Sequence, residues 1–204
     1  MKYADKIRVA VCAAKPDRAE TEARRLAKQG AKGLLSFGFC GGLDPKLKPG
    51  DLVAPRQILS NGDVWGISPF WVGRQVIHAE FGLGRDKIVS DVDQKADLFK
   101  TTRSAVVDME SHRIGKVCNE MNIPFFVLRA VSDPADQAIP KSATNAIDKH
   151  GNAMLLTVAG NLLKNPREIS DLIRLKKQTD IALGALKSAA AKELPLILRS
   201  VELV

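Results

Sequence analysis

The chain has 204 residues and a mass of 22.1 kDa, with 45% hydrophobic and 26% charged residues and a formal net charge of +8 at pH 7. No apolar run reaches the length of a membrane span and the start lacks a signal peptide's apolar region, so a single cytoplasmic globular domain over residues 1–204 is expected. Its basic residues are interleaved with acidic ones, only 5% of residues are aromatic, and no zinc-finger spacing occurs, so no nucleic-acid partner is expected.

Strands and helices are predicted to alternate through the first half of the chain. The expected strands are short apolar runs bounded by turn residues, at residues 7–13, 32–37, 51–60 and 87–90. The expected helices have apolar residues at helical spacing, at residues 17–29, 68–81 and 93–100. Gly30 should end the first helix, and Asn61-Gly62 has the chemistry of a hairpin turn. Residues 38–50 are expected as a turn-rich loop.

The chain is organised around residues 105–137, which read AVVDMESHRIGKVCNEMNIPFFVLRAVSDPADQ. The pattern predicts a strand at 104–108, a helix at 109–122 that stops before Pro124, and a strand at 125–131. A strand–helix–strand unit predicts a right-handed crossover between parallel strands. Because ligands bind outside the carboxyl ends of strands in open α/β sheets, the acidic residues at these ends are candidate site residues.

The C-terminal part is predicted to be helical. A long helix is expected at residues 146–163, and Asn165-Pro166 should break it. A final helix is expected from 167 to about 192, with apolar residues such as Ile169, Ile173 and Leu183 on one side and Pro195 after its end. Alternating strands and helices favour an α/β protein with three layers, α/β/α, around a mixed central sheet.

A glycine cluster follows the strand expected at 32–37. Gly38, Gly41 and Gly42 resemble a phosphate-cradling loop in position, but GFCGG is not GxGxxG and no helix follows, so a dinucleotide site is not expected. The alternative is a tight turn that needs positive φ.

The cysteines do not form a metal or disulfide pattern. Cys12, Cys40 and Cys118 are odd in number and far apart, and no CxxC or Cys/His metal spacing occurs. Reduced thiols and no metal site are therefore expected.

Two separated motifs carry a family resemblance. DMES followed by PFFVLRAVSDPADQ, and GLLSFGFCGGLDPKLKPGDLV at residues 33–53, resemble the nucleoside phosphorylase and nucleosidase superfamily, especially methylthioadenosine/S-adenosylhomocysteine nucleosidases. The motifs SFG..GGLDP and DMESH resemble those of the hopanoid-associated phosphorylase-like branch of this superfamily. The resemblance implies a nucleoside phosphorylase-like fold and cleavage of the N-glycosidic bond of an adenosine-type nucleoside, with adenosylhopane as substrate and adenine as leaving group. It also implies a homo-oligomer without metal or organic cofactor, with inorganic phosphate or water as co-substrate.

The resemblance implies roles for the acidic residues. Asp133 would be the general acid that protonates N7 of the purine, with Ser132 orienting it, because partial burial lets a carboxyl keep its proton near neutral pH. Glu110 would accept hydrogen bonds from the ribose hydroxyls and stabilise an oxocarbenium-like state, while Met109 would pack on the sugar or base. The alternatives are a cap before Pro134 for Asp133, a helix first-turn carboxylate for Glu110, and a core position for Met109.

Other positions support or modify this hypothesis. Arg129 lies in an apolar strand and should have a carboxylate partner, so we expect it to support the site. Asp108 is expected to orient Arg129 or the ribose site, or to have a structural role instead. The glycine turn, including Gly41 and Gly42, would approach the ribose in the resembled family. Phe39 stands where that family has a hydroxyl side chain, and it cannot donate to a phosphate oxygen.

Two further differences from the family concern the nucleophile. Residues 12–15 replace its early phosphate turn, and the glutamate that activates water has no counterpart in the matched residues. The competing hypothesis is therefore a non-catalytic nucleoside-binding protein that has lost the nucleophile site.

Two patterns remain open. Trp65, Phe70 and Trp71 are expected in the core, or as the wall of a binding site. The final helix carries basic residues that could contact an anionic membrane surface, at about 1 kcal/mol each, or simply form a solvated face. These residues are Arg167, Arg174, Lys176, Lys177, Lys187 and Lys192.

Overall fold

The computed structural model describes residues 6–144 and 168–202. Its elements in chain order are α1 (Pro16–Lys28), β1 (Leu34–Gly42), β2 (Leu52–Ser60), β3 (Asp63–Gly66), β4 (Ile77–Gly84), α2 (Val92–Thr102), β5 (Ser104–Asp108), α3 (Ser111–Met121), β6 (Phe125–Asp133), α4 (Lys141–Thr144), α6 (Ile169–Lys192) and α7 (Leu194–Glu202). None of the helices within these described residues is both long enough and apolar enough to cross a membrane.

The strands form one mixed, six-stranded sheet in the order β3-β2-β4-β5-β1-β6. β1–β6, β2–β4 and β4–β5 are parallel, whereas β1–β5 and β2–β3 are antiparallel. β6 also pairs with β2 through Leu52↔Ala130 and Val53↔Arg129, so the sheet curls until β6 reaches β2, the strand next to β3. The expected α/β fold with a mixed sheet is therefore confirmed.

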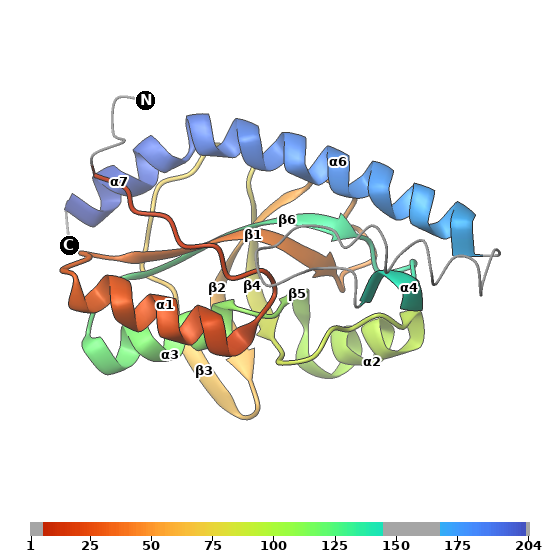
Figure 1. The fold of residues 1–204 in the computed structure, drawn as a ribbon, viewed down its shortest axis with the longest axis horizontal. Coiled ribbons are helices and arrows are strands. Elements are labelled where there is room, and N and C mark those ends of the chain that lie inside the picture. Colours follow the sequence, from red (N-terminus) through yellow and green to blue (C-terminus); the bar gives the residue numbers. More distant parts are fainter. Residues whose placement is uncertain (1–5, 145–167, 203–204) are drawn as a thin grey trace.

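Helices cover both faces of the sheet (Figure 1). The long helix α6 lies along one face with α7 after it, and α1 and α3 lie together on the other face. β6 is buried on both sides because its apolar residues alternate between these layers. Phe126, Leu128 and Ala130 pack in the cluster that contains α6 residues, and Phe125 and Val127 pack in the cluster that contains α3 residues.

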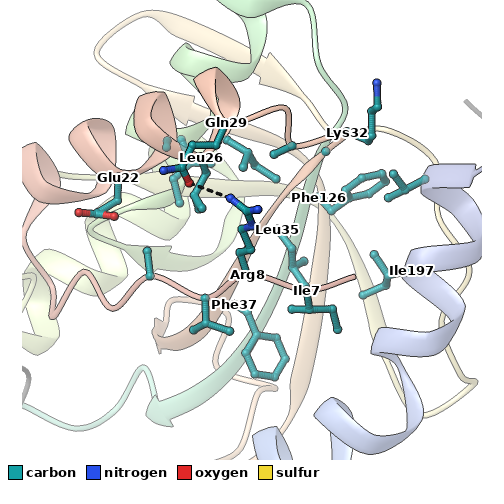
Figure 2. A pocket seen from close by; sticks show the side chains of 18 of the residues that line it. Ile7, Arg8, Glu22, Leu26, Gln29, Lys32, Leu35, Phe37, Phe126 and Ile197 are labelled. Atoms are coloured by element: carbon teal, nitrogen blue, oxygen red, sulfur yellow. Dashed lines mark hydrogen bonds between the residues drawn. The ribbon is translucent and has the colours of Figure 1, made fainter. Parts of the chain in front are cut away.

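The strand expected at residues 7–13 does not form. This segment is extended but has no sheet ladder, and Val9 is 79% exposed. An apolar cavity of about 470 Å³ lies between it, α1, β1 and α7 (Figure 2). The segment is held by other contacts, because Arg8 donates to Gln29 Oε1 at 3.2 Å and Ala14 N donates to Glu110 Oε1 at 2.9 Å.

The prediction of a loop at residues 38–50 is partly wrong, because β1 continues through Gly42. Gly38 and Gly41 pair with Arg129 and Asp133 of β6, and the cluster has no positive φ. Positive φ occurs instead at Gly50, and at Gly30 and Gly62, which end α1 and form the β2–β3 hairpin as expected. The tight-turn interpretation of the cluster is therefore wrong.

Two short predictions in the middle of the chain are also wrong. Residues 68–81 form no helix: an irregular stretch leads into β4, whose ladders with β2 and β5 override the local helical pattern. Residues 87–90 form no strand. Trp65 and Phe70 pack in the core as expected, but Trp71 is 70% exposed.

The central strand–helix–strand unit has the expected elements but a different arrangement. β5, α3 and β6 are confirmed, yet β1 lies between β5 and β6, antiparallel to the former and parallel to the latter. The prediction of parallel, neighbouring strands is therefore wrong. Sequential strands are neighbours in only about two-thirds of cases, and here β1 takes the position between them.

At the C-terminus, the helix expected at 146–163 lies outside the described residues. The final helix is confirmed as α6, but its buried residues are Ala182, Leu186 and Ala189, and Ile173 of the expected stripe is 61% exposed. The prediction missed α7, which begins right after α6. Pro195 does not stop helical structure because it is the second residue of α7, where a missing N–H is tolerated.

Candidate active site

The buried guanidinium of Arg129 is the centre of the first group of candidate residues. Its Nη1 donates to Glu110 Oε2 at 3.1 Å and to the carbonyl of Phe39 at 3.2 Å. Its Nη2 donates to Asp108 Oδ1 and Ser111 Oγ, both at 3.1 Å, and to Ser36 Oγ. The expected carboxylate partner is thus confirmed twice, as Asp108 and Glu110. The pKa of Arg129 is raised, since these carboxylates outweigh the opposing effect of burial.

Asp108 couples this cation to the start of α3. Its Oδ1 accepts from Glu110 N at 2.8 Å and from Ser111 N at 2.7 Å, so it satisfies N–H groups at the helix start that would otherwise lack a partner. The same oxygen contacts Arg129. Asp108 therefore contacts Arg129 and also caps the beginning of α3, which fits both the orienting role and the structural role considered from the sequence.

Glu110 is the last residue before α3 and has both carboxylate oxygens engaged. Arg129 takes Oε2, and the backbone N–H of Ala14 donates to Oε1. Ala13 and Ala14 have φ of 57° and 54°, the left-handed region that L-residues other than glycine seldom adopt. This strained turn therefore covers Oε1 of Glu110.

Asp133 is the centre of the second group. It ends β6, is only 4% exposed, and accepts from Ser132 Oγ at 2.7 Å on Oδ1 and from Lys95 Nζ at 2.7 Å on Oδ2. Burial raises the pKa of Asp133 above its usual value, although Lys95 and Ser132 act in the opposite direction. The direction of this shift suits a carboxyl that must hold a proton.

The glycines of β1 make room for both groups. A Cβ at Gly38 would lie 2.9 Å from Arg129 Nη1, and a Cβ at Gly41 would lie 3.0 Å from Asp133 Oδ2. At Gly42 the nearest atoms would be at an ordinary 3.4 Å. Gly38 and Gly41 are therefore needed for close approach of the side chains of β6, not for turn geometry.

Both groups include a residue of β6, with Arg129 and Asp133 four residues apart in sequence. The register between β1 and β6 shifts between Cys40 and Gly41, so Arg129 lies beside Gly38 and Asp133 beside Gly41. Because Gly38 and Gly41 are three residues apart in β1, the side chains of Arg129 and Asp133 point to opposite faces of the sheet. Residues four apart along a strand are separated by about 13 Å. Met109 is half-buried between Asp108 and Glu110 in sequence, and Phe39 is partly exposed with its carbonyl toward Arg129.

Sequence reasoning missed Lys95, Ser36 and Ser111. Lys95 lies on α2 and has no exposed surface, and the serines complete the contacts of Arg129. Lys95 shares a helix side with Val92 and Leu98, so a lysine on an apolar stripe was a signal that a buried partner exists. No comparable signal marks the serines.

Other chemistry is less suited to this site. The thiols of Cys12, Cys40 and Cys118 are free, and burial raises the pKa of each, to about 12 for Cys118, so they are poor nucleophiles. No group of three or more His, Cys, Asp or Glu residues within 6–144 and 168–202 is placed to hold a metal ion. The apolar cavity of Figure 2 is lined by none of the candidate site residues.

Comparisons with known proteins identify the family of the chain. The family model described as Phosphorylase superfamily matches residues 2–81 and 83–164. The 5'-methylthioadenosine/S-adenosylhomocysteine nucleosidase of Buchnera aphidicola subsp. Baizongia pistaciae is 24% identical over 174 residues, 71% of this chain and 69% of that protein.

Solved structures of proteins with the same activity share the fold. The Helicobacter pylori nucleosidase with butyl-thio-DADMe-Immucillin-A gives a TM-score of 0.57 at 17% identity, covering 87% of this chain and 76% of its own. The Colwellia psychrerythraea nucleosidase in complex with adenine gives 0.54 at 16% identity, covering 73% and 75%. The family match spans most of the chain, and the chain therefore belongs to the phosphorylase superfamily, whose enzymes cleave N-glycosyl bonds.

Proposed function

We propose that this protein cleaves the N-glycosidic bond of an adenosine-type nucleoside and releases adenine. The observation that carries the proposal is the pair of groups built on β6: a buried carboxyl with a raised pKa at Asp133, and a carboxylate held at Glu110 by the buried Arg129. A nucleosidase needs both an acid for the leaving base and negative charge beside the sugar. Relatives bind adenine or inhibitors named as immucillin-A compounds, which supports a purine leaving group.

In the proposed reaction, the bond between C1′ of the ribose and N9 of the purine breaks, and its electron pair stays with the purine. Asp133 gives its proton to N7, so the base leaves as neutral adenine. The positive charge that develops on the sugar lies near Glu110, whose carboxylate stabilises it. A nucleophile then attacks C1′.

Glu110 would bind the ribose in exchange for a backbone contact. Oε2 is fixed by Arg129, so its orientation is set before substrate binds. Oε1 now accepts from Ala14 N, and a ribose hydroxyl would replace this donor. The strained turn at Ala13 and Ala14 would then be free to relax.

Water is the proposed nucleophile. Phe39 has no hydroxyl or charged group that could hold phosphate, and residues 12–15 do not supply the glycine turn of the family. Adenine release should therefore proceed without phosphate and leave a hydroxyl rather than a phosphate on C1′ of the sugar product. Saturable dependence on phosphate would contradict this choice.

The proposed substrate is a lipid-linked nucleoside, adenosylhopane. The choice of this substrate rests on the motifs SFG..GGLDP and DMESH, which resemble those of the hopanoid-associated branch. A homo-oligomer is also proposed, by resemblance to the superfamily. Preference for adenosylhopane over methylthioadenosine in kcat/KM would support the substrate choice, and the reverse preference would contradict it.

A second candidate function is nucleoside binding without catalysis. It is favoured by the occupied Oε1 of Glu110 and by the missing hydroxyl at Phe39. The deciding experiment incubates the protein with adenosine, methylthioadenosine and adenosylhopane, with and without phosphate, and measures adenine by chromatography. Binding without adenine release in every mixture would favour the second function.

A further inference from the structure

Lys95 is a fully buried lysine whose contacts converge on the proposed general acid. Its Nζ lies 2.7 Å from Asp133 Oδ2, 2.9 Å from the carbonyl of Pro134 and 2.9 Å from the carbonyl of Gln137. An ammonium has three donors and no acceptor, and these three oxygens satisfy all of them. Lys95 is 0% exposed, so its charge acts on Asp133 with little screening by solvent.

The environment of Asp133 contains few other charges. From its own strand, Ser132 donates to Oδ1, and from β1 the nearest groups are the Gly41 backbone and the Cys40 thiol. The pKa of Cys40 is raised well above its usual value, first by burial, so this thiol is neutral at working pH. From β5, Val107 is apolar, which leaves the Lys95 ammonium of α2 as the main charge on Asp133.

We propose that Lys95 is a positioning residue for Asp133: it fixes Oδ2 so that the transferable proton is carried on Oδ1, and its charge sets the pH range in which Asp133 keeps that proton. This inference rests on the proposed function of Asp133 as the acid for the leaving purine. Because Oδ2 already accepts a hydrogen bond from the Lys95 ammonium, the proton of the neutral carboxyl is placed on Oδ1. Oδ1 faces Ser132, whose hydroxyl can adapt to either state.

Ser132 has a single hydroxyl proton and two acceptors within reach. Its Oγ lies 2.7 Å from Asp133 Oδ1 and 3.2 Å from the carbonyl of Cys40. When Asp133 is ionised, Ser132 donates to Oδ1. When Oδ1 carries a proton, Ser132 turns to the Cys40 carbonyl. After transfer of the proton from Oδ1 to N7, the new carboxylate is stabilised by Lys95 and again by Ser132.

The sign of the effect follows from the opposing influences on Asp133. Burial raises the pKa of Asp133, and Lys95 works against that rise. A neutral residue at position 95 removes the opposing charge, so Asp133 keeps its proton to higher pH but becomes a weaker acid. The alkaline limb of the pH profile should move upward, and the plateau rate should fall because the carboxylate product of proton transfer loses its counter-charge.

The test compares Lys95→Met with the matched control Lys100→Met, an exposed lysine on the same helix. With a purine nucleoside, Lys95→Met should move the alkaline limb of kcat up by about one pH unit or more and lower the plateau about tenfold, since one pKa unit corresponds to a factor of ten. A nitrophenyl riboside, whose leaving group departs without protonation, should show neither change. An unmoved limb on the purine substrate, or equal changes on both substrates, would overturn the proposal.

A second variant and a second measurement guard against misfolding and against failure of the proposed function. Lys95→Gln is neutral but can still donate to the Pro134 or Gln137 carbonyl. In the full chain, ¹³C NMR titration of the Asp133 carboxyl should give a higher pKa in Lys95→Gln than in the wild type. An equal pKa overturns the inference about Lys95. If the wild type releases no adenine while the pKa still rises, the proposed function fails and the charge coupling of Lys95 stands.

Discussion

Burial raises the pKa of the Asp133 carboxyl and the neighbouring Lys95 lowers it, and the effect of burial is the larger. Glu110 has a different environment, because Arg129 contacts one of its oxygens and the side chain stays partly exposed. Two carboxylates near one another can take separate roles when their environments differ in this way. We therefore expect substitutions of Asp133 and of Glu110 to have different effects on the kinetics.

Asp133→Asn should lower turnover of a purine nucleoside by about 10²–10⁴-fold, the scale of a positioned general acid, with little change in nucleoside affinity. Glu110→Gln should weaken both binding and turnover, because its ribose contact precedes the transition state and strengthens within it. Steady-state kinetics on a purine nucleoside and on a nitrophenyl riboside separate the two roles. Equal losses of Asp133→Asn on both substrates would leave Asp133 as a structural cap before Pro134.

Gly41→Ala should disturb catalysis through Asp133. The added Cβ would lie 3.0 Å from Asp133 Oδ2 and 3.3 Å from Val107 Cγ1, so the carboxyl must shift away from Gly41. Misplacement of a catalytic group by about 1 Å can lower the rate about 10²-fold. Gly66→Ala on β3 is the matched control, because nothing lies within 4 Å of its Cβ. Wild-type kcat in Gly41→Ala would show that β1 does not constrain the acid.

At the scale of elements, α1 and α3 are joined by a charge cluster on the face opposite α6. Arg113 of α3 contacts Glu20 of α1 at 3.1 Å and Asp86 after β4 at 2.8 Å, and Glu20 also pairs with Arg24 and Lys116. Arg24 first, and then Arg113 and Lys116, lower the pKa of Glu20 to about 2. Arg113 first, and then His112, lower that of Asp86 to about 2.

These depressed pKa values predict a loss of stability in acid. A carboxyl with a lowered folded pKa stabilises the fold above its unfolded pKa, and this contribution is lost as pH falls toward the folded value. The free energy of unfolding, measured with urea between pH 6 and 2, should fall from about pH 4.5 downward. Glu20→Gln should flatten this dependence, whereas Glu80→Gln, an exposed residue of β4, should not. An unchanged slope in Glu20→Gln would remove the cluster as the cause.

Helix α6 presents basic residues to solvent along one face of the molecule. Arg174 pairs with Asp171 and Lys176 with Asp180, both at 2.5 Å, while Lys177, Lys187 and Lys192 are exposed. Arg167, also counted in the sequence pattern, lies outside the described residues. Internal pairing thus reduces the charge available for a partner.

If α6 contacts an anionic surface, the protein should sediment with vesicles containing phosphatidylserine at low salt and be released at high salt. Each basic residue near such a surface contributes about 1 kcal/mol. The double variant Lys177→Glu/Lys187→Glu should lose binding, and Lys100→Glu on α2 serves as its control. No binding of the wild type at low salt would establish a solvated helix face.

At the scale of the whole molecule, Arg129 connects the parts of the fold that meet at the sheet. It extends from β6 to the Phe39 carbonyl on β1, Asp108 at the end of β5 and Ser111 in α3, in a sheet where β6 also pairs with β2. Both Nη atoms of Arg129 donate to these groups, whereas its buried Nε has no hydrogen-bond partner in the described residues. Its removal would leave Asp108 and part of Glu110 buried without a counter-charge.

Arg129→Met should therefore reduce the free energy of unfolding by about 3–5 kcal/mol, the usual effect of breaking a buried ion pair from one side. A loss of this size is a large share of the free energy of unfolding of a typical domain, about 5–15 kcal/mol. Arg174→Met, which removes an exposed pair on α6, should change it by less than about 1 kcal/mol. Urea titration of both variants tests the contrast, and similar small effects would mean that the Arg129 network adds little to stability.

The sequence by itself determined the elements whose burial shows in local periodicity. β5, β6, α2, α3 and α6, together with the Asn61-Gly62 hairpin, follow from apolar spacing, capping and turn chemistry that act over a few residues. It also determined that Arg129 needs a carboxylate partner, since a charge within an apolar strand cannot be buried alone. The family resemblance came from motifs in these same stretches.

Only the tertiary structure decided which strands pair and which side chains meet. The apolar run at 7–13 has the pattern of a strand but no ladder, β1 separates β5 from β6, and β4 forms where a helix was expected. Lys95 reaches Asp133 from 38 residues away, and Gly38 and Gly41 matter because β6 side chains fill the space beside them. Periodicity reports whether a residue is buried, whereas ladder partners and buried ion pairs depend on segments distant in sequence, which local patterns do not encode.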